Sequence, residues 1–267
     1  MELVGYILAV FIGVSLGLIG SGGSILTVPL LVYLFHISPV LATTYSLAIV
    51  GLSSIAGVIS RIKQKLVDFK TIFFFGIPSI IGVFSSRKFL LPALPEQIYQ
   101  GTHMMLTKSH FIMLFFATLM LVAAISMITG KNNKEQEGVI PVYGGSLLLV
   151  GFIEGSLTGI VGAGGGFLII PALVLLAKLP MKRAIATSLV IISIKSLVGF
   201  TGDLWHVTLD GSFLLKIIIL ATLGIIIGNY INKKMEGAKL KKGFGFFVLI
   251  MSVVIMIEQF FFSNLIH

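Results

Sequence analysis

The sequence lacks cysteine and has few charged residues. Of its 267 residues, 11% are charged and 57% are hydrophobic, whereas a typical soluble domain has about 25% charged residues. Two stretches, 214–231 and 244–262, are apolar on every side apart from Lys216, Asn229 and Glu258. A helix of this kind has no polar face to turn toward water. The composition therefore excludes a soluble fold and predicts an integral membrane protein in a lipid bilayer.

Other absences narrow the function. Without cysteine there is no disulfide, thiolate metal site or thiol chemistry. No HExxH motif is present, and the glycine clusters lack the lysine of a phosphate-binding loop. The net charge of +9 comes from basic residues in short loops between apolar runs, which fix membrane orientation rather than bind nucleic acid. We expect no enzyme, no catalytic residue, no metal, no cofactor and no nucleic-acid partner.

Eight apolar stretches follow one another along the chain. They cover residues 3–35, 40–59, 71–86, 111–129, 141–177, 184–200, 213–231 and 244–262. One transmembrane helix needs about 20 residues, so the first and fifth stretches are too long for one. Each is interrupted by a glycine cluster, namely Gly20, Ser21, Gly22, Gly23 and Ser24 in the first, and Gly162, Ala163, Gly164, Gly165 and Gly166 in the second. Each long stretch is predicted to be two helical pieces around a break, and no basic region precedes the first, so it is not expected to be a cleaved signal peptide.

The two glycine clusters belong to an internal repeat. Adding 142 to a residue number maps Gly20 onto Gly162 and continues without a gap to Asp68 and Asp210. The sequence thus predicts a first repeat at 1–130, a cytoplasmic linker at 131–140 and a second repeat at 141–267. Duplicated halves are a recurrent transporter architecture.

The charges of the loops predict opposite orientations for the two repeats. Residues 60–70 contain four Lys and Arg and the equivalent 201–212 none, whereas 178–183 contain three and the equivalent 36–39 none. Since basic loops stay in the cytoplasm, we predict that both termini lie outside. The expected fold is an all-α polytopic membrane protein of two inverted-topology repeats, each with a glycine-broken helix or hairpin plus three transmembrane helices. Whether each broken segment is a re-entrant hairpin or two crossings stays open.

The glycine clusters are the predicted substrate site. Irregular backbone is tolerated within a bilayer only where protein buries it or it lines a watery cavity. The helix after each break would present free N–H groups and a positive dipole end, which suit an anion. Every residue of both clusters is therefore a candidate ligand. The alternative is that the glycines only let helices pack closely, which we expect for the isolated pairs such as Gly13 and Gly17.

Polar side chains within apolar runs add further candidates. Lys195 lies deep in 184–200, where a charge costs at least about 2.5 kcal/mol on insertion, so it requires an anionic substrate or a partner such as Glu154. Ser46, Thr187 and Ser188 could face the same cavity or bond their own backbone. Glu154 and Glu258 are candidates for proton coupling.

The paired blocks GLIGSGGSILTVP at 17–29 and GIVGAGGGFLIIP at 159–171 are each followed by ATTYS at 42–46 or AIATS at 184–188. The chain resembles the TauE/SafE family of sulfite exporters, which is similar to the toluene sulfonate uptake permeases. The resemblance covers essentially the whole chain. It implies export of sulfite, sulfoacetate or a related organosulfonate across a prokaryotic cell membrane. The first copy has Tyr45 where the second has Thr187, so the two halves are not expected to be equivalent in every contact.

The sequence thus predicts a secondary transporter that exports a small sulfur-containing anion by alternating access at a midplane site. Import coupled to a cation, a channel, and a non-transporting membrane scaffold or sensor are the alternatives. The sequence leaves the identity of the anion, the coupling ion and a homo-oligomer open.

Overall fold

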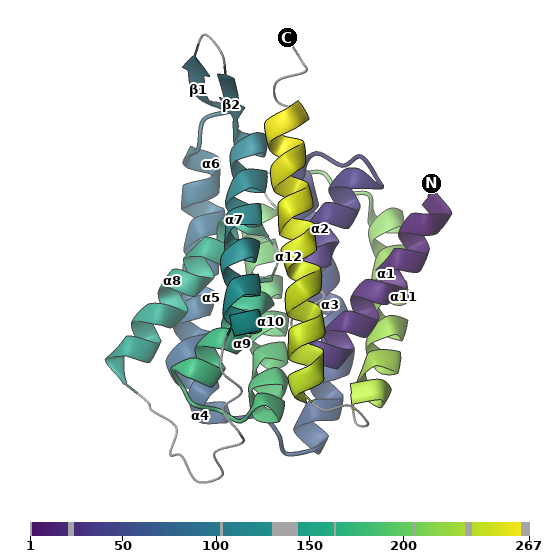
Figure 1. Cartoon of the computed structure of the whole chain (residues 1–267), viewed down its shortest axis with the longest axis vertical. Coiled ribbons are helices and arrows are strands. Elements are labelled where there is room, and N and C mark those ends of the chain that lie inside the picture. The colour runs from purple at the N-terminus through teal and green to yellow at the C-terminus, as the bar shows by residue number, and fades with distance from the viewer. Residues whose placement is uncertain are drawn as a thin grey trace.

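The computed structural model describes residues 2–20, 24–101, 104–129, 144–162, 164–204, 207–232 and 237–262. Within them the chain is almost entirely helical (Figure 1). The first part contains α1 (Glu2–Ile19), α2 (Ser24–Tyr33), α3 (Pro39–Lys63), α4 (Phe69–Thr71), α5 (Ile77–Ser85), α6 (Leu91–Ala93) and α7 (Lys108–Thr129), and the second contains α8 (Gly145–Val161), α9 (Gly166–Leu175), α10 (Met181–Asp203), α11 (Gly211–Asn232) and α12 (Gly237–Phe262). The predicted linker 131–140 and the predicted ligands Ser21, Gly22, Gly23 and Ala163 lie outside the described residues.

The elements of the two parts share their order and much of their spacing. Adding 142 to Ser24–Tyr33 gives Gly166–Leu175, so α2 and α9 coincide in this register. The starts of α3 and α10, at Pro39 and Met181, coincide as well. The backbone also repeats, because His36 and Lys178 have positive φ angles of 54° and 52°. The chain therefore passes through the same series of elements twice.

The two parts are interlocked by close helix packing. Along α1, a Cβ atom at Gly13 would lie 2.8 Å from the Ala221 carbonyl carbon of α11. The equivalent contact joins α8 to α5, where a Cβ at Gly155 would lie 2.7 Å from the Ser79 carbonyl carbon. Glycine is needed at both places because any side chain would separate the helices. The first helix of each part thus packs on a helix of the other, and the packing role expected for the isolated glycines is what the geometry shows.

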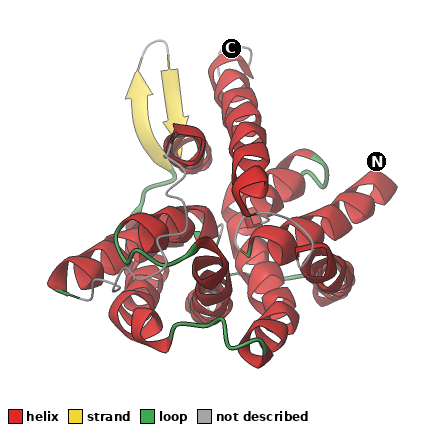
Figure 2. Cartoon of the chain, turned by 60° about the horizontal axis from the view of Figure 1, so that its bottom comes forward, coloured by secondary structure: helices red, strands yellow, loops and turns green. Residues whose placement is uncertain are grey.

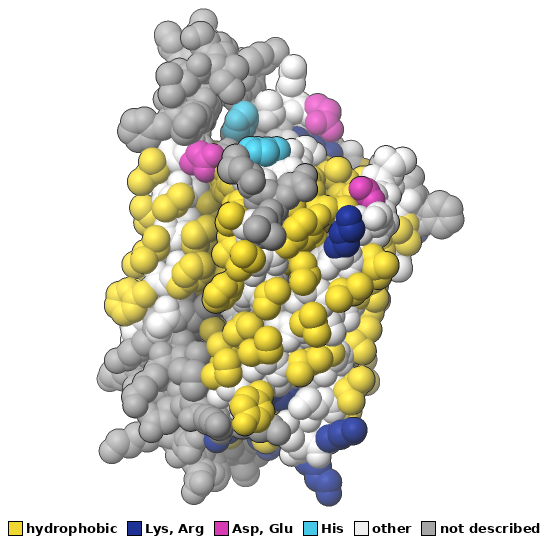
Figure 3. Space-filling view, turned by 90° about the vertical axis from the view of Figure 1, so that its right-hand side faces the viewer, with side chains coloured by type: hydrophobic (Ala, Val, Ile, Leu, Met, Phe, Trp, Pro, Cys, Tyr) yellow, Lys and Arg dark blue, Asp and Glu magenta, His cyan; other side chains and the backbone are white. Residues whose placement is uncertain are grey.

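Helices α3 and α10 form the centre of the bundle. Buried positions make up 72% of the most apolar stretch of each, against 28% for α11 and 39% for α7. The outer helices instead expose large apolar side chains, and Figure 3 shows these as a broad band between the two ends of the molecule. Examples are Phe11, Leu149, Leu215 and Ile250, whose exposed fractions lie between 59% and 61%. Large apolar side chains are this exposed over a whole surface only where lipid or another protein covers them. Among the described residues, five helical segments are long and apolar enough to cross a membrane. The chain is a multi-pass membrane protein.

Two aspartates fix the turns that follow the central helices. The Asp68 side chain accepts a hydrogen bond from the Thr71 N–H (2.8 Å), and the equivalent Asp210 accepts one from Phe213 N–H (3.0 Å). The Asp68 N–H donates to the Thr187 hydroxyl (2.9 Å), while the Asp210 N–H donates to the Tyr45 hydroxyl (2.7 Å). Tyr45 and Thr187 occupy equivalent positions, so they make the same contact although their side chains differ.

The third helical segment is longer than the predicted span 71–86. It continues from Phe69 to Ala93 and includes a π-helical turn at Ser86–Leu90. Arg87, the first residue after the predicted span, is thus part of the helix, and its side chain is 0% exposed. Buried polar groups, described below, bond part of the Arg87 guanidinium.

An antiparallel hairpin of β1 (Gln97–Gly101) and β2 (Met104–Thr107) precedes α7. It is an addition to the helical fold that the sequence analysis did not predict. Figure 2 shows it projecting away from the helices.

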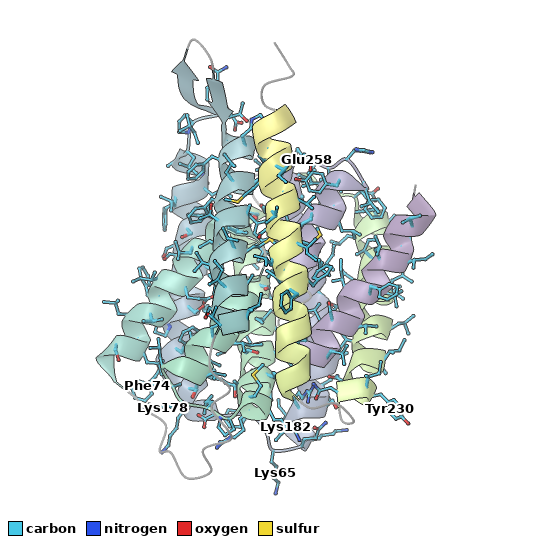
Figure 4. All side chains as sticks on the ribbon, viewed as in Figure 1. Lys65, Phe74, Lys178, Lys182, Tyr230 and Glu258 are labelled. Carbon is cyan, nitrogen blue, oxygen red and sulfur yellow. The ribbon has the colours of Figure 1, made fainter. Side chains whose placement is uncertain are left out.

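The basic loops and the outer ends of the chain's terminal helices lie at opposite ends of the molecule. Lys65, Lys178 and Lys182 are all at the lower end in Figure 4. Helix α1 begins and α12 ends toward the upper end (Figure 1). In the same view α8 begins at the lower left and Lys178, which follows α9, is again at the lower end. The α8–α9 segment thus turns back to the side from which it started.

Candidate functional site

Both glycine breaks have the left-handed backbone that glycine permits. Gly20 follows α1 with φ 80°, and Gly162 follows α8 with φ 70°. Their N–H groups complete the preceding helices, because Gly20 N–H donates to Leu16 O (2.7 Å) and Gly162 N–H to Thr158 O (2.9 Å). Gly164 and Gly165 continue the second break with φ 64° and 69°. A side chain in this conformation is strained, which accounts for glycine at these positions.

The two breaks lie against the central helices. A Cβ atom at Gly20 would meet the Ile185 carbonyl oxygen of α10 at 2.6 Å. At the second break, Gly162 lies against Thr43 of α3, and a Cβ at Gly164 would meet Val50 of α3 at 3.1 Å and Ser196 of α10 at 3.0 Å. The start of α3 lies beside the end of α10, because Thr44 donates to Asp203. Gly20 and Gly162 therefore contact opposite ends of this helix pair, and Gly164 lies between them, against Val50 and Ser196.

The candidate hydroxyl groups have different environments. The Ser46 hydroxyl is buried and has no hydrogen-bond partner among the described residues. Ser188 donates to the Ile185 carbonyl of its own helix (3.0 Å), as the alternative interpretation of membrane serines expected. Thr187 accepts the Asp68 N–H and so holds a loop. Ser24 begins α2 and is fully buried.

Lys195 and Glu154 form a buried ion pair. The Lys195 Nζ atom lies 2.6 Å from Glu154 Oε1, and the two side chains are 0% and 4% exposed. Lys195 also donates to the Thr158 hydroxyl (3.1 Å), and the Ser79 hydroxyl donates to Glu154 Oε2 (2.6 Å). The structural partner considered for Lys195 is therefore present, and Ser79 and Thr158, which the sequence analysis did not select, complete its surroundings.

The ion pair lies directly beside the second glycine break. A Cβ atom at Gly165 would lie 2.6 Å from Lys195 Nζ and would also collide with Glu154. Helix α9 starts at Gly166, so the positive end of its dipole lies at the same place. Absence of a side chain at Gly165 thus lets the backbone approach two opposite charges at once.

A second buried ion pair joins Arg87 to Asp203. Arg87 Nη1 lies 2.8 Å from Asp203 Oδ2, with side chains 0% and 6% exposed. Thr44 donates to the same carboxylate oxygen (2.7 Å). The guanidinium also occupies the space that a side chain at Gly162 would need. The only sequence signal for this pair was that Arg87 and Asp203 each stand at the end of an apolar run.

Glu258 lies apart from these groups. It is a partly exposed residue near the upper end of α12 (Figure 4). Across the part of the chain that the structure describes, no group of three or more His, Asp or Glu side chains could hold a metal ion.

The fold and these contacts define a multi-pass helical membrane protein with buried ion pairs beside broken helices. The profile of the family described as sulfite exporter TauE/SafE matches residues 6–255. The chain belongs to the TauE/SafE family of membrane transporters.

Named relatives agree with this assignment. The chain is 28% identical to the probable membrane transporter protein YunE of Bacillus subtilis, over 94% of this chain and 95% of the relative. It is 26% identical to a probable membrane transporter protein of Xylella fastidiosa, over 92% and 91%. A relative from Methanocaldococcus jannaschii is 28% identical over 72% and 70%. No solved structure matches the chain significantly.

Proposed function

We propose that the protein is a secondary transporter that exports a small sulfur-containing anion, such as sulfite or an organosulfonate, by alternating access. The observation that carries this proposal is the contact of both glycine breaks with the buried α3–α10 pair, through Ile185 and Thr43. Helices broken within the bilayer present backbone N–H groups and dipole ends to a ligand, an arrangement that suits an anion and that secondary transporters use.

Inverted repeats are part of the same proposal. The inversion is supported by two basic residues that follow non-equivalent helices, Lys65 after α3 and Lys178 after α9. Both lie at the same end of the molecule (Figure 4). Two halves of inverted topology cross the bilayer in opposite directions. By moving against each other they can open the substrate site first to one side of the membrane and then to the other. We place the lower end in the cytoplasm because it carries these basic side chains.

Export requires no energy-coupling site if the substrate is an anion. An inside-negative potential favours exit by about 2.3 kcal/mol per charge for every 100 mV. Import of the same anion would need a co-transported cation, for which Glu154 and Glu258 are the candidate proton carriers. Glu154 already holds Lys195 and Ser79, so a proton on it would have to disturb the ion pair.

The test is sulfite flux in liposomes of the purified protein, with the membrane potential set by a potassium gradient and valinomycin. Gly164→Leu is expected to abolish saturable flux, because its side chain would have to displace Ser196 and Val50 at a backbone with positive φ. The matched control is Gly211→Leu, since a Cβ at Gly211 meets nothing within 4 Å.

Each outcome separates the candidates. Flux that follows the potential outward without a pH gradient supports the exporter, and flux that requires an inward proton gradient supports the importer. Currents far above carrier turnover would indicate a channel. If folded wild-type protein moves no sulfur anion, the non-transporting membrane scaffold or sensor is the remaining candidate function.

A further inference from the structure

Arg87 is a buried arginine at the second glycine break with part of its guanidinium unused. It lies in the π-helical turn Ser86–Leu90 of a membrane-spanning segment. Such turns often occur at functional sites. Its side chain is 0% exposed, and its Nη2 atom lies where a side chain at Gly162 would otherwise be.

The guanidinium is held from one side only. Nη1 donates to Asp203 Oδ2 (2.8 Å) and to the Thr43 hydroxyl (3.0 Å). Nε and Nη2, which form the opposite edge, have no hydrogen-bond partner among the described residues. These two N–H groups are parallel and match the spacing of two oxygens on one oxyanion. Leaving both unbonded in a buried place is unfavourable.

A second group at the same break has no partner either. The Ser196 hydroxyl is fully buried and unbonded among the described residues, and it lies 3.0 Å from the position of a Cβ at Gly164. The guanidinium edge lies at Gly162, the hydroxyl at Gly164 and the start of α9 at Gly166, so the three groups follow one another along the break. All three can donate hydrogen bonds to an anion.

The other buried arginine of the central bundle differs in this respect. Arg61 is 3% exposed, but its Nη2 donates to the Gly17 carbonyl (3.0 Å) and its Nη1 to the Asn232 side chain (3.0 Å). Its Nε atom also has no hydrogen-bond partner among the described residues, but Nη2 is already bonded to Gly17, so the Nε–Nη2 edge of Arg61 is partly occupied. Arg61 is thus a matched control of equal charge and similar burial.

We propose that the Nε and Nη2 edge of Arg87 is a bidentate binding site for the oxyanion group of the substrate, with Asp203 holding the guanidinium in position. The proposal rests on the proposed transport function and extends it to a residue and a ligand class: sulfite, sulfonate or a similar oxyanion, in preference to a spherical halide. Because the edge is buried, the anion reaches it only when the second break opens, as alternating access requires.

The experiment measures binding of radiolabelled sulfite to the full-length protein in detergent, with chloride as competitor, after thermal unfolding has shown that each variant is folded. Arg87→Lys keeps the charge and the partner Asp203 but removes the fork, so sulfite affinity should fall about ten-fold or more and the preference over chloride should shrink. Asp203→Asn removes the competing carboxylate charge but keeps a side-chain oxygen that can accept the hydrogen bond from Arg87 Nη1. The guanidinium therefore stays in position, and sulfite affinity should rise. Arg61→Lys should leave both the affinity and the preference unchanged.

The outcomes are distinct. If Arg87→Lys binds sulfite with wild-type affinity and selectivity, or if Arg61→Lys weakens it equally, the Arg87 site is refuted while the transport function stands. If folded wild-type protein binds no oxyanion, the proposed function itself fails. Should Arg87→Lys not fold, Asp203→Asn decides: tighter sulfite binding supports the site, and unchanged or weaker binding overturns it.

Discussion

Removing one member of the Lys195–Glu154 ion pair should destabilise the protein strongly, whereas removing both should not. The pair is 2.6 Å long and its side chains are 0% and 4% exposed. Loss of one partner from such a pair costs about 3–5 kcal/mol because the remaining charge is buried without compensation. After Glu154→Gln, the Lys195 ammonium keeps the hydroxyl groups of Thr158 at 3.1 Å and Ser79 at 3.4 Å. After Lys195→Met, Glu154 keeps its 2.6 Å bond from Ser79.

The assay is a double-mutant cycle on the free energy of unfolding, measured by denaturant titration in mixed micelles. Glu154→Gln should cost more than Lys195→Met, because the contacts left to Lys195 are longer than the one left to Glu154. The double variant should recover most of the loss, since replacing both members of a buried pair is often nearly neutral. Additive effects, with a coupling below about 0.5 kcal/mol, would refute the reasoning.

The same cycle separates the two roles of Lys195 when sulfite flux is measured beside stability. A double variant that regains both stability and flux assigns a structural role to the pair. Regained stability without flux shows that at least one of the two charged groups, Lys195 or Glu154, takes part in transport itself. Both roles are compatible with the depth of Lys195 in its apolar run and with its contact to Glu154.

Two further predictions concern packing and capping. Gly155→Leu should clearly lower the unfolding temperature, because a side chain at Gly155 would meet the backbone of α5. Gly211→Leu should leave it unchanged, because a Cβ at Gly211 meets nothing within 4 Å. Circular dichroism during heating measures both unfolding temperatures. Tyr45→Phe and Thr187→Val each remove the acceptor of one aspartate N–H and should each cost about 0.5–1.5 kcal/mol. Markedly unequal costs in denaturant titration would contradict the equivalence of these two positions.

The sequence predicted well where a local backbone property decides the structure. The helical pieces around each glycine cluster follow from residues that permit a positive φ, and Gly20 and Gly162 have this conformation. Depth in an apolar run likewise indicated that Lys195 needed a partner, and Glu154 is bonded to it. Both inferences need only the sequence near one residue and the known cost of a charge in lipid.

The sequence predicted poorly where contacts between residues far apart in the chain decide the position of a side chain. Arg87 appeared to end a helix because a charge after an apolar run usually marks the membrane surface. Its actual place depends on Asp203, 116 positions away in the chain. Thr187 was expected either to face the cavity or to bond its own backbone, and neither interpretation points to its partner Asp68, which lies 119 positions away. No local sequence pattern predicts such pairings. The internal repeat would predict the contact in one half only after the equivalent contact in the other half is known.

The charges at the second break balance each other, which bears on how fast the transporter can work. Lys195 is paired with Glu154 and Arg87 with Asp203. An anion bound at the proposed site would therefore meet hydrogen-bond donors rather than an uncompensated cation. A site must bind its ion well enough to admit it and weakly enough to release it. Asp203→Asn should therefore bind sulfite more tightly and turn over more slowly, measured as a lower KM and a lower maximal flux in liposomes. A maximal flux at or above the wild-type value would show that release from this site does not limit transport.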